Sequence, residues 1–290
     1  MFFLLGKEFL VREGYELLDA GDFRKLEQVG PYRVIRPCPQ AVWHPQRSTQ
    51  EWQGAHGEFC RSSSGNGTWK LRGKIPASWN ISLYGHQVLV RLTDFGHLGF
   101  FPEHHLHGVI PWAQQHPGKK KILHLFAYTG TGSVSLAACG MDVVHVDASK
   151  TSLAWGKENV ELTPVTGSIR WILDDAHKFV QREARRGQQY DGILLDPPSF
   201  GRDPAGKVWK IEEHLLPLLE DLKSLRSPEF SFFQLTSHSP FYTPVVLENL
   251  VQDWWGSAPG IVSSFEMTVQ ETSSNRRLPC GAGAWIRREF

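Results

Sequence analysis

The pattern of apolar and polar positions changes in character near residue 116. Beyond it, short apolar runs alternate with amphipathic segments, which is the pattern of alternating strands and helices. We expect strands over residues 122–128, 142–146, 169–173, 191–196 and 230–235, with a closing β-pair at 263–269 and 284–288. Helices are expected over 133–139, 149–162, 176–186, 208–222 and 245–255. Repeated strand–helix units predict an α/β fold with a doubly wound, mostly parallel sheet of seven strands.

The first part of the chain is rich in Trp, Pro, Gly and His and shows short strand-like runs. These runs cover residues 32–35, 68–71 and 81–93, and the small polar residues 62–67 indicate a loop or hairpin turn between two of them. Pro117 and Gly118, followed by three lysines, mark a boundary. We therefore predict a small β-rich module over 1–116 and an α/β domain over 117–290.

Charge and cysteine usage limit the partners and the cellular compartment that we expect. Lys and Arg number 31 against 30 Asp and Glu, so strong non-specific binding to nucleic acid gains no support, although a local basic face is not excluded. The four cysteines form no C-x-x-C pair and no evident disulfide framework. The apolar run at residues 1–5 is too short for a signal peptide, and no window is apolar enough to span a membrane. We expect a cytoplasmic protein.

In doubly wound sheets, ligands bind at the carboxyl ends of the strands, so the residues after each strand are the candidates for chemistry. After the first comes Tyr128-Thr-Gly130-Thr-Gly132. These glycines let the backbone approach a ligand closely, although a Gly-x-Gly turn is equally compatible with simple chain reversal. The third glycine of the dinucleotide fingerprint is missing, because Val134 and Ser135 occupy that region. A dinucleotide cofactor is therefore disfavoured.

Carboxylates follow the next two strands. Asp147 ends the second and is placed to accept hydrogen bonds from ribose hydroxyls; the alternative is that it caps the following helix. Asp174 and Asp175 follow the third, where one could accept a bond from an adenine amino group and the other cap a helix.

The most specific signal is Asp196-Pro197-Pro198-Ser199-Phe200, after the fourth strand. Two prolines end the strand and make the loop rigid. Their outward carbonyls, beside a carboxylate, suit an amino group or a planar ring, and Phe200 could stack on a base or cover the donor. The plainer interpretation is a rigid turn.

Three segments resemble a known family: residues 125–130 (Leu-Phe-Ala-Tyr-Thr-Gly), 146–149 (Val-Asp-Ala-Ser) and 193–200 (Ile-Leu-Leu-Asp-Pro-Pro-Ser-Phe). They are similar to the bacterial 23S ribosomal RNA large-subunit methyltransferases, over about residues 99–239. The resemblance implies a class I, Rossmann-like methyltransferase that uses S-adenosylmethionine.

Residue roles follow from this resemblance. It implies that Tyr128, Gly130 and Gly132 hold the methionine part of the donor, that Asp147 binds the ribose and Asp175 the adenine. It further implies that Asp196 lies at the donor and that Asp196, Pro197, Pro198 and Phe200 face the acceptor. The segment containing Glu103 and His104 matches one that closes over the donor; an exposed His-rich loop is the alternative. A metal site at His104, His105 and His107 is not expected, because the spacing fits no usual zinc motif.

One departure from the family concerns the acceptor. The 5-methylcytosine members of the family carry a nucleophilic cysteine in a Ser-Cys-Ser context, where this chain has Ser237-His238-Ser239. Cys280 lies far along the sequence and is not assigned that role. A thiolate must add to the pyrimidine before carbon is methylated, so a nitrogen or oxygen acceptor is favoured. His238 is then a candidate base, and Asp196 with the Pro197 carbonyl would orient an amino acceptor.

RNA, ribosomal RNA in particular, is the partner that the resemblance favours. Residues 119–121 and Arg182, Arg185 and Arg186 would then lie near the substrate, unless they are ordinary solvated faces. A methyltransferase for a small molecule or a protein, and a donor-binding module without catalysis, remain as alternatives. Four tryptophans, Trp43, Trp52, Trp69 and Trp79, either stack on bases or build the core of the first module.

Overall fold

The computed structural model describes residues 14–62, 66–202, 206 and 208–288. The chain forms two compact units: residues up to 102 together with 268–279, and residues 103–267 together with the segment from 280 onward. Sequence analysis placed the change at residue 116. Residues 103–116 instead group with the second unit, because Val109 and Ala113 of helix α2 (Val109–Gln115) are buried in its core.

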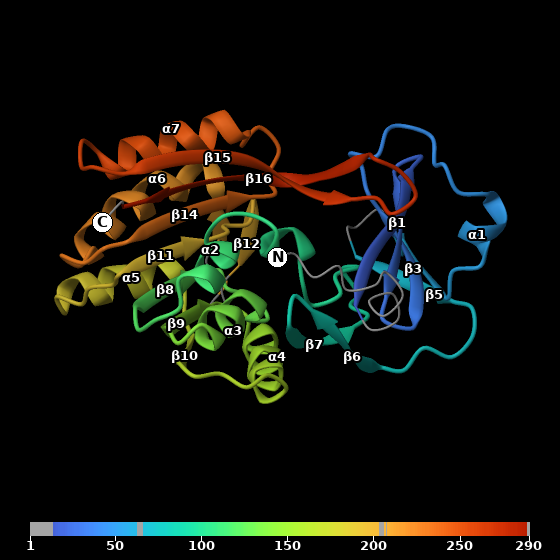
Figure 1. Ribbon diagram of the computed structural model, residues 1–290, viewed down its shortest axis with the longest axis horizontal. Helices are drawn as coiled ribbons and strands as arrows, with labels where there is room; N and C mark the ends of the chain where they lie inside the picture. Colours follow the sequence, from blue (N-terminus) through green and yellow to red (C-terminus); the bar gives the residue numbers. More distant parts are fainter. Residues whose placement is uncertain (1–13, 63–65, 203–205, 207, 289–290) are drawn as a thin grey trace, which may run out of the picture. The chain divides into compact units, whose positions relative to one another are not determined.

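The second unit is built on a seven-stranded sheet with the order β10-β9-β8-β11-β14-β16-β15 (Figure 1). The first five strands in this order run parallel, whereas β16 is antiparallel to β14. The strands are β8 (Lys121–Leu125), β9 (Asp142–Asp147), β10 (Ser168–Leu173), β11 (Gly192–Leu195), β14 (Phe232–Ser237), β15 (Ile261–Gln270) and β16 (Arg277–Arg287). The predicted doubly wound, mostly parallel sheet is confirmed.

Helices cover both faces of this sheet, so its central strands are buried on both sides. In β8, Leu123 and Leu125 pack into one core together with α5, α6 and α7, whereas Ile122 packs into the opposite core with α2 and α3. This explains why the strands read as nearly continuous apolar runs. The helices are α3 (Thr131–Ala138), α4 (Lys150–Glu161), α5 (Ala176–Arg185), α6 (Ile211–Leu222) and α7 (Pro244–Trp255), with short 3-10 turns η1 (Pro102–His105) and η2 (Lys223–Leu225).

The first unit contains a five-stranded sheet, β1-β2-β3-β4-β5, and a separate hairpin, β6-β7. Its elements are β1 (Tyr15–Gly21), β2 (Arg24–Val29), β3 (Tyr32–Pro37), α1 (Thr49–Gln53), β4 (Gly57–Arg61), β5 (Gly67–Leu71), β6 (Ser78–Leu83) and β7 (His86–Arg91). The expected single strand over 81–93 is wrong, because the chain reverses at Tyr84 and Gly85, with φ of 51° and 86°. Such a turn needs positive φ at both positions, and Tyr-Gly lacks the usual Asn-Gly signal.

Sequence analysis missed β1, β2, β4 and α1, and its turn over 62–67 is described only in part. Ser62 and Asn66 are hydrogen-bonded between the antiparallel strands β4 and β5, as expected for a hairpin connection. Residues 63–65 lie outside the described residues.

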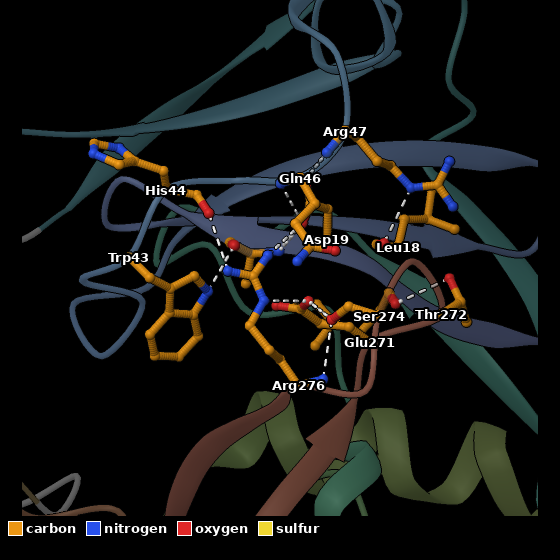
Figure 2. Close-up of polar contacts among 12 residues, drawn as sticks. Leu18, Asp19, Trp43, His44, Gln46, Arg47, Glu271, Thr272, Ser274 and Arg276 are labelled. Atoms are coloured by element: carbon orange, nitrogen blue, oxygen red, sulfur yellow. Dashed lines mark hydrogen bonds and ion pairs between the residues drawn. The ribbon is translucent and has the colours of Figure 1, made fainter.

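The tip of the β15–β16 hairpin belongs to the first unit, where Arg276 holds it (Figure 2). The Arg276 guanidinium contacts Glu271 Oε2 at 3.2 Å and Asp19 Oδ1 at 3.7 Å, and donates to the His44 carbonyl at 3.0 Å. Asp19 is fully buried and also accepts the Trp52 indole N–H at 3.1 Å. Residues from opposite ends of the sequence thus share one buried polar network.

The four tryptophans of the first module are committed to its structure. Their indole N–H groups donate to Ala20 O (from Trp43), Asp19 Oδ2 (Trp52), Thr93 O (Trp69) and Val29 O (Trp79). Trp52 and Trp79 are buried. These contacts favour packing over base stacking. In the described part of the chain, no helix has the length and apolar character needed to cross a membrane.

Candidate active site

The carboxyl ends of the parallel strands bring the predicted site residues to one edge of the sheet. Leu125 at the end of β8 is in register with Val146 of β9 and Leu195 of β11, and Leu195 is in register with Leu235 of β14. The loops that leave these strands therefore begin side by side, as expected for a ligand site in a doubly wound fold.

The loop after β8 has an unusual backbone. Phe126 and Tyr128 have φ of 54° and 52°, values that are costly for aromatic residues, and Gly130 has φ of 76°. A Cβ atom on Gly130 would also lie 3.0 Å from the Trp171 ring. Gly130 is the N-cap of α3, so the loop leads its backbone directly into a helix amino terminus. The glycine is required both by its backbone conformation and by the neighbouring indole.

Asp147 fixes this loop. Its Oδ2 accepts the backbone N–H of Tyr128 at 2.8 Å, and its Oδ1 accepts that of Ser149 at 2.8 Å. Burial raises the pKa of the Asp147 carboxyl. The cap of α4 is Ser149, whose hydroxyl accepts the N–H of Ser152, so Asp147 is not the capping residue. Each carboxylate oxygen retains a second lone pair that can accept a ribose hydroxyl.

The two carboxylates after β10 have different partners. Asp175 is the N-cap of α5, because its Oδ1 accepts the Lys178 N–H at 2.9 Å. Asp174 forms an ion pair with Arg182 at 2.6 Å. The capping role expected for one of the pair therefore falls to Asp175, and an adenine contact by Asp175 would add to it.

The loop after β11 returns as a small hairpin, β12 (Phe200–Arg202) with β13 (Val208–Lys210). The predicted helix from residue 208 accordingly begins three residues later. The Pro198 carbonyl accepts the Trp209 indole N–H at 2.7 Å, so this carbonyl faces the protein, contrary to expectation. Phe200 remains 55 % exposed.

Asp196 meets two histidines from other segments. His104 Nε2 lies 3.4 Å from Asp196 Oδ2 and 3.1 Å from His238 Nε2, and His238 Nε2 lies 3.6 Å from the same carboxylate oxygen. Asp196 Oδ1 accepts the hydroxyl of Thr236 at 2.8 Å. The Glu103 carboxylate lies 3.9 Å from His238 Nδ1. Neither the histidine spacing nor the separation of Asp196 and His238 predicted this group.

The electrostatics of this group favour an ionised Asp196 carboxylate beside a protonated His104 imidazole. Burial opposes ionisation of Asp196, but His238 and His104 together hold the pKa of its carboxyl far below the usual range. Burial likewise opposes a charge on His104, yet the Asp196 carboxylate raises the pKa of its imidazole. The group can therefore orient a polar acceptor, or accept and hold a proton at His104.

A second histidine cluster lies beneath the glycine loop, and sequence analysis did not anticipate it. The Ser133 hydroxyl lies 2.8 Å from His124 Nδ1 and 3.0 Å from His145 Nδ1. Burial lowers the pKa of His124 to about 4 and that of His145 well below its usual value. Both imidazoles are neutral packing groups at pH 7.

The lysine run lies at the end of the sheet opposite the carboxyl edge. Lys121 begins β8, its backbone N–H bonds the Asp191 carboxylate, and its ammonium lies over the Tyr190 ring. Lys121 and Leu125, at the carboxyl end of the strand, are four residues apart, a distance of about 13 Å. Contact between this run and the substrate stays a prediction.

Comparison with known proteins decides the family. The model for S-adenosylmethionine-dependent methyltransferases matches residues 53–220. The chain belongs to this family. A crystal structure of an S-adenosylmethionine-dependent methyltransferase from Agrobacterium tumefaciens is 37 % identical, with a TM-score of 0.88, and the match covers 95 % of this chain and 90 % of that one. The donor is therefore S-adenosylmethionine.

More distant relatives agree on fold and differ in length. A putative methyltransferase solved with S-adenosylhomocysteine has a TM-score of 0.74 at 16 % identity, covering 96 % of this chain and 76 % of its own, which supports the fold. The ribosomal RNA large subunit methyltransferase K/L of Pseudoalteromonas translucida is 34 % identical over 148 residues, or 50 % of this chain. The matched segment spans only 20 % of that relative.

Proposed function

We propose that this enzyme transfers the methyl group of S-adenosylmethionine to a nitrogen or oxygen atom of RNA, with ribosomal RNA as the favoured substrate. The observation that carries the proposal is the carboxylate of Asp196, which a rigid loop and two histidines hold at the carboxyl edge of the sheet. The curated relatives that match half of the chain are named as ribosomal RNA methyltransferases, which supports the choice of RNA. A ribosomal RNA substrate implies a cytoplasmic enzyme.

On the donor side, the backbone of Tyr128, Gly130 and Gly132 would hold the methionine part. Asp147 would accept the ribose hydroxyls and Asp175 the adenine amino group. The hydrogen bond between Tyr128 and Asp147 supports the first two assignments, because it joins the glycine loop to the ribose-binding acid. Glu103 and His104 would close the site, since η1 brings both to the carboxyl edge beside Asp196 and His238.

On the acceptor side, a lone pair of the substrate attacks the methyl carbon as the bond to sulfur breaks, so catalysis depends mainly on alignment and exclusion of water. Asp196 would orient the acceptor, Pro197 and Pro198 would keep the loop rigid, and the exposed ring of Phe200 would stack on the base. His238 would accept a proton where the acceptor carries one.

Carbon methylation is the second candidate, because the structure removes one argument against it. Cys280 is distant in sequence, but its carbonyl lies 2.8 Å from His238 Nδ1. Sequence separation therefore does not exclude this thiol from the acceptor side. Substitution Cys280→Ser separates the two candidates, since a covalent mechanism requires the thiolate.

The test is transfer of radiolabelled methyl from S-adenosylmethionine to protein-free ribosomal RNA, followed by nucleoside analysis. We expect the wild type and Cys280→Ser to give the same N- or O-methylated nucleoside, and Asp196→Asn to lose most of kcat. Asp221→Asn, at a carboxylate paired with His177 on α5, is the matched control. Label in protein or small molecules but not in RNA would overturn the substrate, and loss of activity in Cys280→Ser alone would favour carbon methylation.

A further inference from the structure

Three potential metal ligands converge at the carboxyl edge of the sheet. The Nε2 atoms of His104 and His238 and the Oδ2 atom of Asp196 form a triangle with sides of 3.1, 3.4 and 3.6 Å. They come from three separate segments, namely η1, the loop after β11 and the residue after β14. Among the residues that the structure describes, this is a group of ligand type and spacing able to hold a metal ion.

The triangle has the dimensions of one face of a coordination tetrahedron. Zinc bonds imidazole nitrogen and carboxylate oxygen at about 2.0–2.1 Å, which places neighbouring ligand atoms of a tetrahedral site roughly 3.3–3.4 Å apart. Adjacent ligands of an octahedral site at that bond length would lie closer, at about 2.9 Å. The observed sides average nearer to the tetrahedral value, so bound zinc would require little movement of the side chains.

The surroundings orient two of these ligands as metal sites require. His238 Nδ1 lies 2.8 Å from the Cys280 carbonyl, to which it can only donate, and this leaves the lone pair of a neutral imidazole on Nε2. Asp196 accepts the Thr236 hydroxyl through Oδ1 and so presents Oδ2 to the histidines. A carbonyl behind a ligating histidine and a hydroxyl behind a ligating carboxylate are the usual supports of a metal site.

We propose that His104, Asp196 and His238 form a zinc site with three protein ligands and one open coordination position. Two imidazoles, one carboxylate and an open position make up the ligand set of catalytic rather than structural zinc. The open position would take water or an oxygen or nitrogen atom of the acceptor. This inference goes beyond the proposed function, because zinc binding does not depend on which acceptor is methylated. With zinc bound, the open coordination position would orient the acceptor in place of the Asp196 and His238 side chains, which would then hold the metal.

Metal analysis of the full chain without a histidine tag tests the proposal, after equilibrium dialysis against zinc. We expect one zinc per chain in the wild type, and affinity lower by roughly a hundredfold or more in His238→Ala and in the nearly isosteric Asp196→Asn. The control is His177→Ala, which removes a histidine that contacts a single carboxylate, Asp221, at 2.7 Å. Cobalt substitution should give the visible absorption of a tetrahedral ion in the wild type and in the control.

Two further measurements make the result decisive. Thermal unfolding shows whether each variant is folded, and calorimetry with S-adenosylhomocysteine reads the donor site separately. Absence of zinc from wild type that binds S-adenosylhomocysteine overturns the metal site and leaves the proposed function intact, with the three side chains then acting as a hydrogen-bonded group. Retention of zinc by both His238→Ala and Asp196→Asn would also overturn it.

Discussion

The backbone N–H of Tyr128 donates to Asp147 Oδ2 over 2.8 Å, joining the loop after one strand to the acid that ends the next. Tyr128 has a positive φ, so its loop conformation needs an external partner. The same carboxylate is the proposed ribose ligand. Loop shape and the proposed donor recognition therefore depend on one side chain.

Removing the Asp147 side chain should impair both the loop conformation and donor binding. We expect Asp147→Ala to weaken S-adenosylhomocysteine binding by at least about tenfold, or about 1.4 kcal/mol, as measured by calorimetry. Asp142→Ala is the matched control, because Asp142 begins the same strand at the edge away from the site and pairs with Ser168. Equal affinities for the two variants would remove Asp147 from the donor site.

Gly130 should tolerate no side chain. The left-handed conformation costs alanine about 1–2 kcal/mol, and its Cβ would press against Trp171 at 3.0 Å. Gly187→Ala separates the two effects, because Gly187 has φ of +61° with no atom within 4 Å of the added Cβ. In denaturant unfolding, we expect Gly130→Ala to lose more stability than Gly187→Ala, and also to lose donor affinity. Similar losses of stability with unchanged affinity would contradict the close fit of this loop.

Partly buried His124 makes stability depend on pH. Its pKa is about 4 in the folded protein, as against about 6.5 for an unperturbed imidazole, so the unfolded chain binds the proton first as pH falls. The free energy of unfolding linked to neutral His124 is fully present above pH 6.5. It is lost progressively down to pH 4, to a total of about 3 kcal/mol. His124→Asn, which retains an amide for Ser133, should show a flatter loss of unfolding free energy between pH 7 and pH 5. A wild-type profile parallel to that of the variant would show that another group is responsible.

In the first unit, Glu27 and Arg36 form a buried ion pair. Their Oε2 and Nε atoms lie 2.6 Å apart, and Arg36 with Lys25 lowers the pKa of Glu27 to about 2 against the opposing effect of burial. Glu27→Gln leaves the Arg36 charge uncompensated and should cost about 3–5 kcal/mol of unfolding free energy. Glu220→Gln, at an exposed pair with Lys223, should change it by at most about 1 kcal/mol. Comparable values for both variants in urea unfolding would show that Arg36 finds other compensation.

The loops of the proposed donor site could be located in the sequence because their signals are local. These signals are the glycines after one strand, the acid at the end of the next and Asp196-Pro-Pro. Each acts through backbone conformation or strand termination, which depend on neighbouring residues. For Asp147, by contrast, sequence analysis left two roles open, ribose ligand and helix cap. Its contact with Tyr128 decided that it supports the loop, and Ser149 proved to be the cap.

The sequence by itself determined the parallel sheet, the order of its strands and helices along the chain, and the edge at which the proposed donor site lies, because hydrophobic period and turn chemistry are short-range properties. Only the tertiary structure decided which distant side chains meet. His104, Asp196 and His238 are separated by 134 residues between the first and the last, and Cys280 is a further 42 residues on, yet all four meet at one edge. Sequence distance carries no information about such contacts, since pairing of β11, β14 and β16 brings Asp196, His238 and Cys280 together and the η1 turn adds His104.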